Sequence, residues 1–171
     1  MALLTAEIEA LIGMESEPVA ACDAVERGAV RRFAQASLDD DAIYHDDGAA
    51  SRFQGPVAPP LFPMTMFRED FGTPDVLTER AGDPDFDGIV GATVQGLPPL
   101  PVKGLALLNG GTEVEFFAYA RHGSRIIAKS RYETIYEKAG KSGPMLFVVI
   151  ATDYAADGQL LLRVRKTQIR R

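Results

Sequence analysis

The chain has 171 residues and a net charge of −6 at neutral pH, so a single domain with its own core is expected over residues 1–171. The acidic balance argues against a nucleic-acid partner, because a phosphate backbone favours a basic surface. No stretch has the pattern of a signal peptide or the length of a bilayer span. We therefore expect no membrane association and a cytoplasmic location.

The single cysteine, Cys22, has no second cysteine in the chain with which to form a disulfide. It lies in the apolar run 19–22, and free cysteine is among the most buried residue types. We expect a small buried side chain in a reducing compartment.

The first forty residues predict, in order, a helix over 6–12, a strand over 18–24 and a second helix that ends near Ser37. Thr5 can cap the first helix. In the second helix Val30, Phe33 and Ala34 share one face at i, i+3, i+4 spacing. The other face is expected to point three arginines to water: Arg27, Arg31 and Arg32.

The segment 60–71 is apolar on nearly every side, through Leu61, Phe62, Met64, Met66 and Phe67. A helix with this pattern must be buried on nearly every side, so the segment predicts a central helix. The segment 72–104 that follows is rich in turn signals, and so long a loop is usually functional or packed against a partner.

The last third of the chain has the two-residue period of β-strands. Strands are expected over 112–119, 125–138, 145–151 and 160–169, with turns at Lys141-Ser142-Gly143 and Asp157-Gly158. In the second of these strands Ala128, Tyr132 and Tyr136 should share the buried face. The predicted class is α+β, with an antiparallel sheet of five or six strands wrapped around one central helix.

Four motifs then carry a family resemblance. They read RFAQA at 32–36, DDDAIYHD at 39–46, GPVAPPLFP at 55–63 and LNGGTEVE at 108–115. In this order, with Ser142-Gly143-Pro144 and the ending 167–171, they resemble the N-terminal, FAS1-like dehydratase domain of the MaoC-like hotdog superfamily. The resemblance covers nearly the whole chain. The sequence departs from the family pattern at Leu38, Asp41, Ala42 and Asn109, where the pattern has Gly, Asn, Pro and His.

The resemblance implies a hotdog fold and reversible addition of water to a 2-enoyl thioester of CoA or of a carrier protein, with no other cofactor. The family activates water with an Asp and a His five residues apart on a loop that overhangs the sheet. A backbone N–H at the start of the central helix stabilises the thioester oxygen.

This chain departs from the family at both places. The residue five positions after Asp39 is Tyr44, whose phenol is a poor base at neutral pH, and His45 follows one position late. Pro59 and Pro60 stand where the helix-start donor is expected, and proline has no N–H. Because one lost oxyanion donor alone costs about a hundred- to a thousandfold, the sequence predicts a non-catalytic, substrate-binding subunit paired with a catalytic MaoC-domain protein.

The resemblance also implies which residues shape the acyl pocket. They are Ile43, Tyr44, Pro59, Pro60 and Phe62.

Other interpretations stay open. The chain could be a stand-alone acyl-CoA-binding hotdog protein without turnover, or a homodimeric hydratase that uses Asp39 and His45 as a shifted catalytic pair. The acidic run could also be only a solvated loop. Calcium binding is disfavoured because Ile43 and Tyr44 occupy positions that need an oxygen ligand and a glycine.

Three further features of the chain are His45, His122 and the basic ending. No metal site is expected, because His45 has no suitably spaced His or Cys. His122, beside Gly123, fits a turn. The basic ending fits either a solvated strand face or contact with phosphate on a CoA or carrier-protein arm, through Arg163, Arg165, Lys166, Arg170 and Arg171.

Overall fold

The computed structural model describes residues 2–67, 72–74, 76–84, 96–102, 104–141 and 143–171. In chain order its elements are α1 (Ala6–Glu9), β1 (Val19–Ala24), α2 (Arg27–Ala36), three 3₁₀ turns (Ala42–Tyr44, Ser51–Phe53 and Phe62–Thr65), α3 (Val76–Arg80), β2 (Leu107–Phe116), β3 (Arg125–Gly140), β4 (Gly143–Ala156) and β5 (Gln159–Arg170). None of the helices in these ranges has the length and apolarity to cross a membrane.

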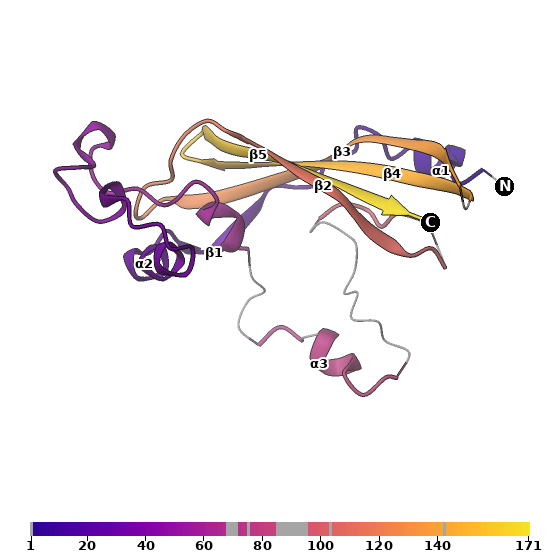
Figure 1. Cartoon of the computed structure of the whole chain (residues 1–171), viewed down its shortest axis with the longest axis horizontal. Helices are drawn as coiled ribbons and strands as arrows, with labels where there is room; N and C mark the ends of the chain where they lie inside the picture. The colour runs from indigo at the N-terminus through magenta and orange to yellow at the C-terminus, as the bar shows by residue number, and fades with distance from the viewer. Residues whose placement is uncertain (1, 68–71, 75, 85–95, 103, 142) are drawn as a thin grey trace.

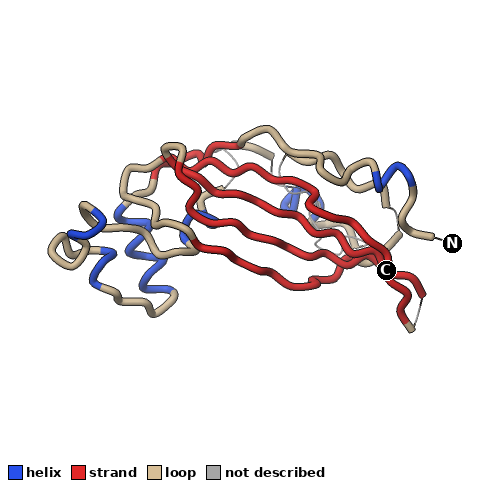
Figure 2. The backbone as a smooth tube through the Cα atoms, turned by 90° about the horizontal axis from the view of Figure 1, so that it is seen from above, coloured by secondary structure: helices blue, strands red, loops and turns tan. Residues whose placement is uncertain are grey.

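The strands form one antiparallel sheet in the order β1-β3-β4-β5-β2. The continuously apolar strand β4 lies at its centre, as its sequence indicates. Asp157 and Gly158 join β4 to β5 with φ values of 52° and 78°, which is the left-handed geometry of a tight hairpin turn. Figures 1 and 2 show α2 and the 3₁₀ turns at one end of the sheet and α1 with the N-terminus at the other. The predicted α+β class, with an antiparallel sheet of five or six strands, is confirmed, and the sheet has five.

The two N-terminal helices form where the sequence predicts them. Thr5 caps α1 by accepting a hydrogen bond from the Ile8 N–H at 3.4 Å, although α1 ends earlier than expected, at Glu9. In α2, Val30 and Ala34 are buried in a core cluster that includes Leu162 of β5. A second core cluster lies near α1 and contains Ile8, Tyr132 and Leu146, among others.

The prediction of a long central helix over 60–71 is wrong in the part that the structure describes. There, only Phe62–Thr65 is helical, as a single 3₁₀ turn, and Met66 and Phe67 are not helical. The remaining residues, 68–71, lie outside the described ranges. Pro60 and Pro63 each remove a backbone N–H, and prolines so closely spaced oppose a regular helix. The predicted burial is nevertheless present, because Phe62 is only 4% exposed and packs edge-to-face on Phe33.

Strand β3 contains a bulge that overturns one predicted face. Tyr132 pairs with Ile150 but Thr134 pairs with Val149, so Glu133 is an extra residue. One inserted residue moves every later side chain to the opposite face. Tyr136 therefore lies on the outer face of the sheet, stacked on Phe147 with ring centroids 5.1 Å apart, rather than beside the buried Tyr132.

The prediction of a buried cysteine is also wrong, since Cys22 is exposed. Strand β1 is an edge strand that covers the core with one face only. Ala21, at 3% exposure, faces the core, and the next residue, Cys22, points to the opposite side.

Within the segment 72–104 the structure describes one short helix, α3, which lies apart from the sheet in Figure 1. Asp75 and Ser142, which belong to expected turns at 73–75 and 141–143, lie outside the described residues.

Candidate functional site

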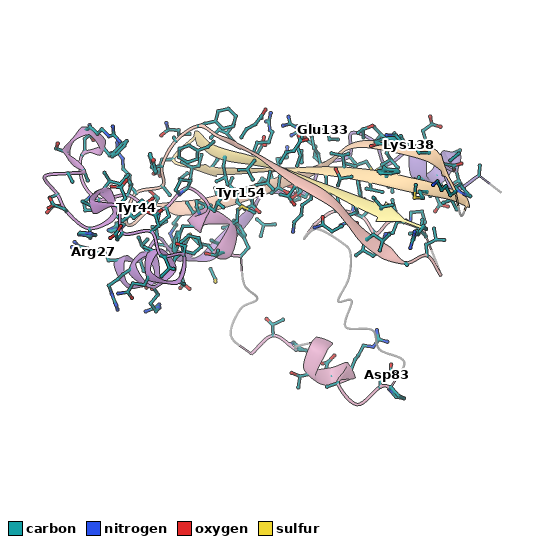
Figure 3. All side chains as sticks on the ribbon, in the orientation of Figure 1. Arg27, Tyr44, Asp83, Glu133, Lys138 and Tyr154 are labelled. Atoms are coloured by element: carbon teal, nitrogen blue, oxygen red, sulfur yellow. The ribbon has the colours of Figure 1, made fainter. Side chains whose placement is uncertain are left out.

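A cavity of about 730 Å³ lies between α2 and the loop that follows it. The loop contributes Asp39, Tyr44 and His45 to its wall. Helix α2 contributes Arg27, Gly28 and Arg31, among others, and a distant turn contributes His122. Figure 3 shows Arg27 and Tyr44 at the end of the molecule beside α2, far from both chain termini.

The loop that carries the acidic cluster is shaped by local side-chain bonds. The Ser37 hydroxyl donates to the Phe33 carbonyl at 2.9 Å and closes α2. Leu38 then adopts a left-handed conformation, with φ of 54°, which reverses the chain. Asp41 caps the turn Ala42–Tyr44 by accepting from the Ile43 N–H at 3.1 Å. These bonds bring Tyr44 back to face Asp39.

Tyr44 and Asp39 form the central contact of the site. The Tyr44 hydroxyl donates to Asp39 Oδ2 at 2.8 Å. Burial of the ring, and then the hydrogen bond to Asp39, raise the pKa of Tyr44 above its ordinary value. The phenol is therefore protonated at neutral pH and donates its hydrogen to Asp39, and a neutral phenol is a poor general base.

His45 follows Tyr44 and lines the same cavity as Asp39. Its backbone N–H donates to the Ala42 carbonyl at 3.1 Å, and its side chain is exposed. The structure thus brings together two residues that the sequence singled out, as the homodimeric alternative requires.

The other predicted pocket residues lie elsewhere. Ile43 and Phe62, at 7% and 4% exposure, are members of one buried apolar cluster and do not line the cavity. Pro59 is buried and Pro60 is partly exposed, and Pro59 accepts a hydrogen bond from the Phe62 N–H at 2.9 Å. Their contact with an acyl chain stays a prediction. The two prolines precede a single 3₁₀ turn, which offers a much weaker helix terminus than a long helix.

Several lining residues were missed as site residues from the sequence, among them Arg27, Gly28, Arg31 and His122. The arginines were interpreted as solvent-facing, and His122 as a turn residue, which it is. One local signal could have identified the arginines: they lie one turn apart at the start of a helix with no capping side chain. His122 reaches the cavity only through the tertiary fold.

The family model described as "FAS1-like, dehydratase domain region" matches residues 10–164. The chain belongs to this family. Among solved structures, the chain is similar to the ChsH1-ChsH2 complex from Mycobacterium tuberculosis, with 18% identity, a TM-score of 0.68, and 96% of this chain and 86% of that chain covered.

Two further structures are similar to this FAS1-like dehydratase domain. The MaoC-like dehydratase from Rhodospirillum rubrum has 19% identity, a TM-score of 0.57 and coverage of 94% and 93% of the two chains. The C-terminally truncated HadBC (3R-hydroxyacyl-ACP dehydratase) complex from Mycobacterium tuberculosis has 17% identity, a TM-score of 0.56 and coverage of 93% and 96%. At these identities the likeness concerns the fold, and it confirms the MaoC-like hotdog architecture. No curated protein matches the sequence.

The basic ending of this FAS1-like dehydratase domain divides between the two faces of the sheet. Arg163 and Arg165 are half-buried on the outer face, where they bond to Asp153 and Glu133 at 2.5 and 2.7 Å, rather than being freely solvated. Lys166 and Arg170 follow the alternation to the inner face. Arg170 is only 9% exposed, and its Nε has no hydrogen-bond partner among the described residues.

The described part of the FAS1-like domain contains no group of three His, Cys, Asp or Glu residues placed to hold a metal ion.

Proposed function

We propose that this chain is the substrate-binding, non-catalytic subunit of a hydratase or dehydratase that acts on 2-enoyl or 3-hydroxyacyl thioesters. A catalytic MaoC-domain protein is its partner. The observation that carries the proposal is the Tyr44 to Asp39 hydrogen bond of 2.8 Å, because it places a protonated phenol where the resembling enzymes have a histidine base. A donor in that place cannot accept the proton of the attacking water.

The helix start supports the same assignment. Pro59 and Pro60 offer no N–H to a thioester oxygen, and the residues that follow form one 3₁₀ turn. Water addition needs both a base and an oxyanion donor, so the loss of both accounts for a half that binds substrate without turning it over.

Strand β2 supports the need for a partner. It lies at the edge of the sheet, and every residue after Leu107 is exposed. Val114, Phe116 and Phe117 are 41%, 41% and 53% exposed, which is unusual for apolar residues at one sheet edge. Two of the similar structures, ChsH1-ChsH2 and HadBC, are complexes of two named components, in keeping with a subunit role.

The test is an enoyl-CoA hydration assay that follows loss of the conjugated thioester. We expect no hydration by the isolated chain and hydration after it is mixed with its nearest MaoC-domain neighbour in the host genome. In that complex Asp39→Ala and His45→Ala should retain activity within about a factor of ten, because neither removes a transition-state interaction.

A homodimeric hydratase is the second candidate, because Asp39 and His45 line one cavity. On that function the wild-type chain alone hydrates the substrate, and His45→Ala lowers the rate by about a hundred- to ten-thousandfold. That result would overturn the subunit assignment. Substrate binding by the chain, with no hydration in any mixture, would instead identify a stand-alone acyl-thioester-binding protein.

A further inference from the structure

The cavity has a cationic side that the proposed chemistry does not use. Arg27 and Arg31 lie one turn apart on α2, and both line the cavity. Within the described part of the chain neither forms an ion pair, and Arg31 makes one hydrogen bond, to Gln35 Oε1 at 3.2 Å. Two guanidinium groups without carboxylate partners, on one wall of a cavity, offer paired donors to an oxyanion.

The start of α2 adds to this cationic side. Its N-cap, Glu26, makes no side-chain bond to the helix, and the first helical bond runs from the Val30 N–H to the Glu26 carbonyl. The N–H groups of the first turn therefore have no partner within the helix, and the helix dipole favours an anion beside them. Gly28 lies in this turn and lines the cavity without a side chain to cover its backbone.

An independent observation comes from His122, on the turn between β2 and β3. It also lines the cavity, and its Nε2 is buried without a hydrogen-bond partner among the described residues. His122 and Arg27 line the same cavity. Burial, and then the charge of Arg27, lower the pKa of the His122 imidazole, which favours the neutral ring. A buried ring nitrogen without a hydrogen-bond partner costs free energy, and a ligand atom bound here could form the missing hydrogen bond.

The cavity also has carboxylates and apolar surface. Asp39 and Asp40 line it together with the arginines, and Asp39 is already bonded to Tyr44. Ala34 and Leu38 add apolar surface to the lining. The cavity therefore suits a ligand that combines an anionic group with hydrogen-bond donors, such as amide N–H groups.

We propose that this cavity binds the phosphoryl group of a small organic molecule, with Arg27, Arg31 and the backbone N–H of Gly28 as donors. The identity of the ligand rests on the proposed function. If the chain binds an acyl thioester, the ligand is the phosphopantetheine arm of that thioester. That arm combines a phosphate with amide groups, and CoA and a carrier protein both present it.

The experiment is calorimetric titration of the whole chain with CoA, with 4′-phosphopantetheine, with phosphate-free pantetheine and with a carrier protein bearing the phosphopantetheine arm. We expect CoA and 4′-phosphopantetheine to bind about tenfold or more tightly than pantetheine. 4′-Phosphopantetheine differs from pantetheine only by the phosphate, so its advantage measures the charge-assisted bonds to that group. Binding of the carrier protein but not of CoA would identify the carrier-protein arm as the source of the phosphate. Equal binding of CoA and pantetheine would overturn the proposal.

Arginine substitutions inside and outside the cavity separate specific binding of the phosphate from general attraction to positive charge. Arg27→Ala with Arg31→Ala should weaken CoA binding by about tenfold or more, whereas Arg52→Ala, an exposed arginine outside the cavity, should leave it within about twofold. An equal loss in Arg52→Ala would mean non-specific attraction and would overturn the site.

Gly28→Ala tests the site with a variant in which weaker CoA binding cannot be explained by loss of folding. A Cβ at Gly28 meets only Arg32 Nη1, at 3.5 Å, which is ordinary contact, and alanine favours helix more than glycine. We expect a chain at least as stable as wild type that binds CoA several-fold more weakly, because the methyl group covers the N–H. Unchanged CoA affinity would remove Gly28 from the site.

Different results would refute the proposed function and the proposed phosphoryl site. A mixture with the MaoC partner that hydrates enoyl-CoA, with a KM that the Arg27→Ala, Arg31→Ala variant leaves unchanged, would refute the phosphoryl site alone. CoA binding that depends on the two arginines, with no hydration in any mixture, would refute the subunit function alone.

Discussion

At the scale of single residues, Leu38 is held in a conformation that its side chain does not favour. Its φ is 54° and its side chain is 92% exposed, so no packing offsets the strain. A left-handed conformation costs an L-residue about 1–2 kcal/mol relative to glycine. The family pattern has glycine at this position, which fits the geometry of the loop after α2.

Leu38→Gly should therefore stabilise the chain. We expect the free energy of unfolding to rise by about 0.5–1 kcal/mol, because relief of strain exceeds the extra entropy that glycine gives the unfolded chain. Urea denaturation measures this change. Leu61→Gly is the matched control, because Leu61 is 48% exposed but has an ordinary φ of −89°, and it should be destabilising. Stabilisation by both substitutions, or by neither, would contradict the strain argument.

Phe62 is the predicted pocket residue with the deepest burial. Because it packs on Phe33 at 4% exposure, Phe62→Ala should lower the free energy of unfolding by about 3–5 kcal/mol. Denaturation of the isolated chain measures this loss. Phe117→Ala, at 53% exposure, is the control and should change stability by less than about 1 kcal/mol.

The milder Phe62→Leu allows the acyl-pocket role to be tested in the reconstituted complex. If Phe62 contacts the acyl chain, the ratio of kcat/KM values for neighbouring chain lengths should change by the equivalent of about 1–3 kcal/mol. An unchanged ratio would leave Phe62 as a core residue only.

At the scale of elements, the outer face of the sheet is held by a ladder of charges across β3, β4 and β5. Asp153 accepts two bonds from Arg163, at 2.5 and 2.6 Å, and lies 3.7 Å from Arg131. The hydrogen bonds from Arg163 outweigh burial and lower the pKa of Asp153. Burial alone would raise the pKa of Glu133, but bonds from Arg165 and Arg131 lower it overall.

These lowered pKa values predict acid sensitivity. A carboxyl group whose pKa is lower in the folded than in the unfolded chain stabilises the fold above its unfolded pKa of about 4, and this stability is lost as the pH falls through the folded pKa. Asp153→Asn should cost about 1–3 kcal/mol near neutral pH, and less at about pH 3 and below. Denaturant titrations across this pH range measure the difference.

Asp83→Asn is the control for that experiment. Asp83 pairs with Arg80 at 3.1 Å on the surface, where both side chains are at least 40% exposed. Such a pair contributes at most about 1 kcal/mol. If Asp153→Asn has no greater effect than Asp83→Asn near neutral pH, the ladder does not stabilise the sheet.

The strands and the segment around Phe62 show which features could be predicted from the sequence and which could not. Period-two alternation located β3, a continuous apolar run located β4, and the turn at Asp157-Gly158 marked the start of β5. The alternation assigned Tyr136 to the wrong face because the bulge at Glu133 leaves no clear mark in the sequence. Burial of the segment around Phe62 followed from its composition, but its two prolines made a helix the wrong form for that burial.

At the scale of the whole molecule, the motifs identified the loop from Asp39 to His45 but not the cavity that it helps to form. The cavity depends on α2, the loop and the turn at His122 meeting in space. The sequence related Tyr44 to Asp39 through the five-residue spacing that the family resemblance implies, and the structure adds their hydrogen bond. His122 comes from a part of the chain that only the folded sheet brings near. The open edge at β2 likewise becomes visible only once the strand order is known.

The edge at β2 predicts association in solution. An edge strand that is exposed on both faces and carries Val114 and Phe116 is suited to pair with a strand of another subunit, either the MaoC-domain partner or a second copy of this chain. We expect the wild-type chain at micromolar concentration to have at least the mass of a dimer, alone or with its partner, by light scattering.

Val114→Lys should weaken this association. It places a charge on an exposed edge, which opposes pairing with another strand, and it removes a side chain that is 41% exposed in the single chain. Ile127→Lys is the matched control, because Ile127 is 43% exposed but lies on β3, which already pairs with β1 and β4. The expected result is a mass close to that of the monomer for Val114→Lys and an unchanged mass for Ile127→Lys. A wild-type chain that stays monomeric both alone and with MaoC-domain candidates would refute the role of this edge, as would equal dissociation by the two variants.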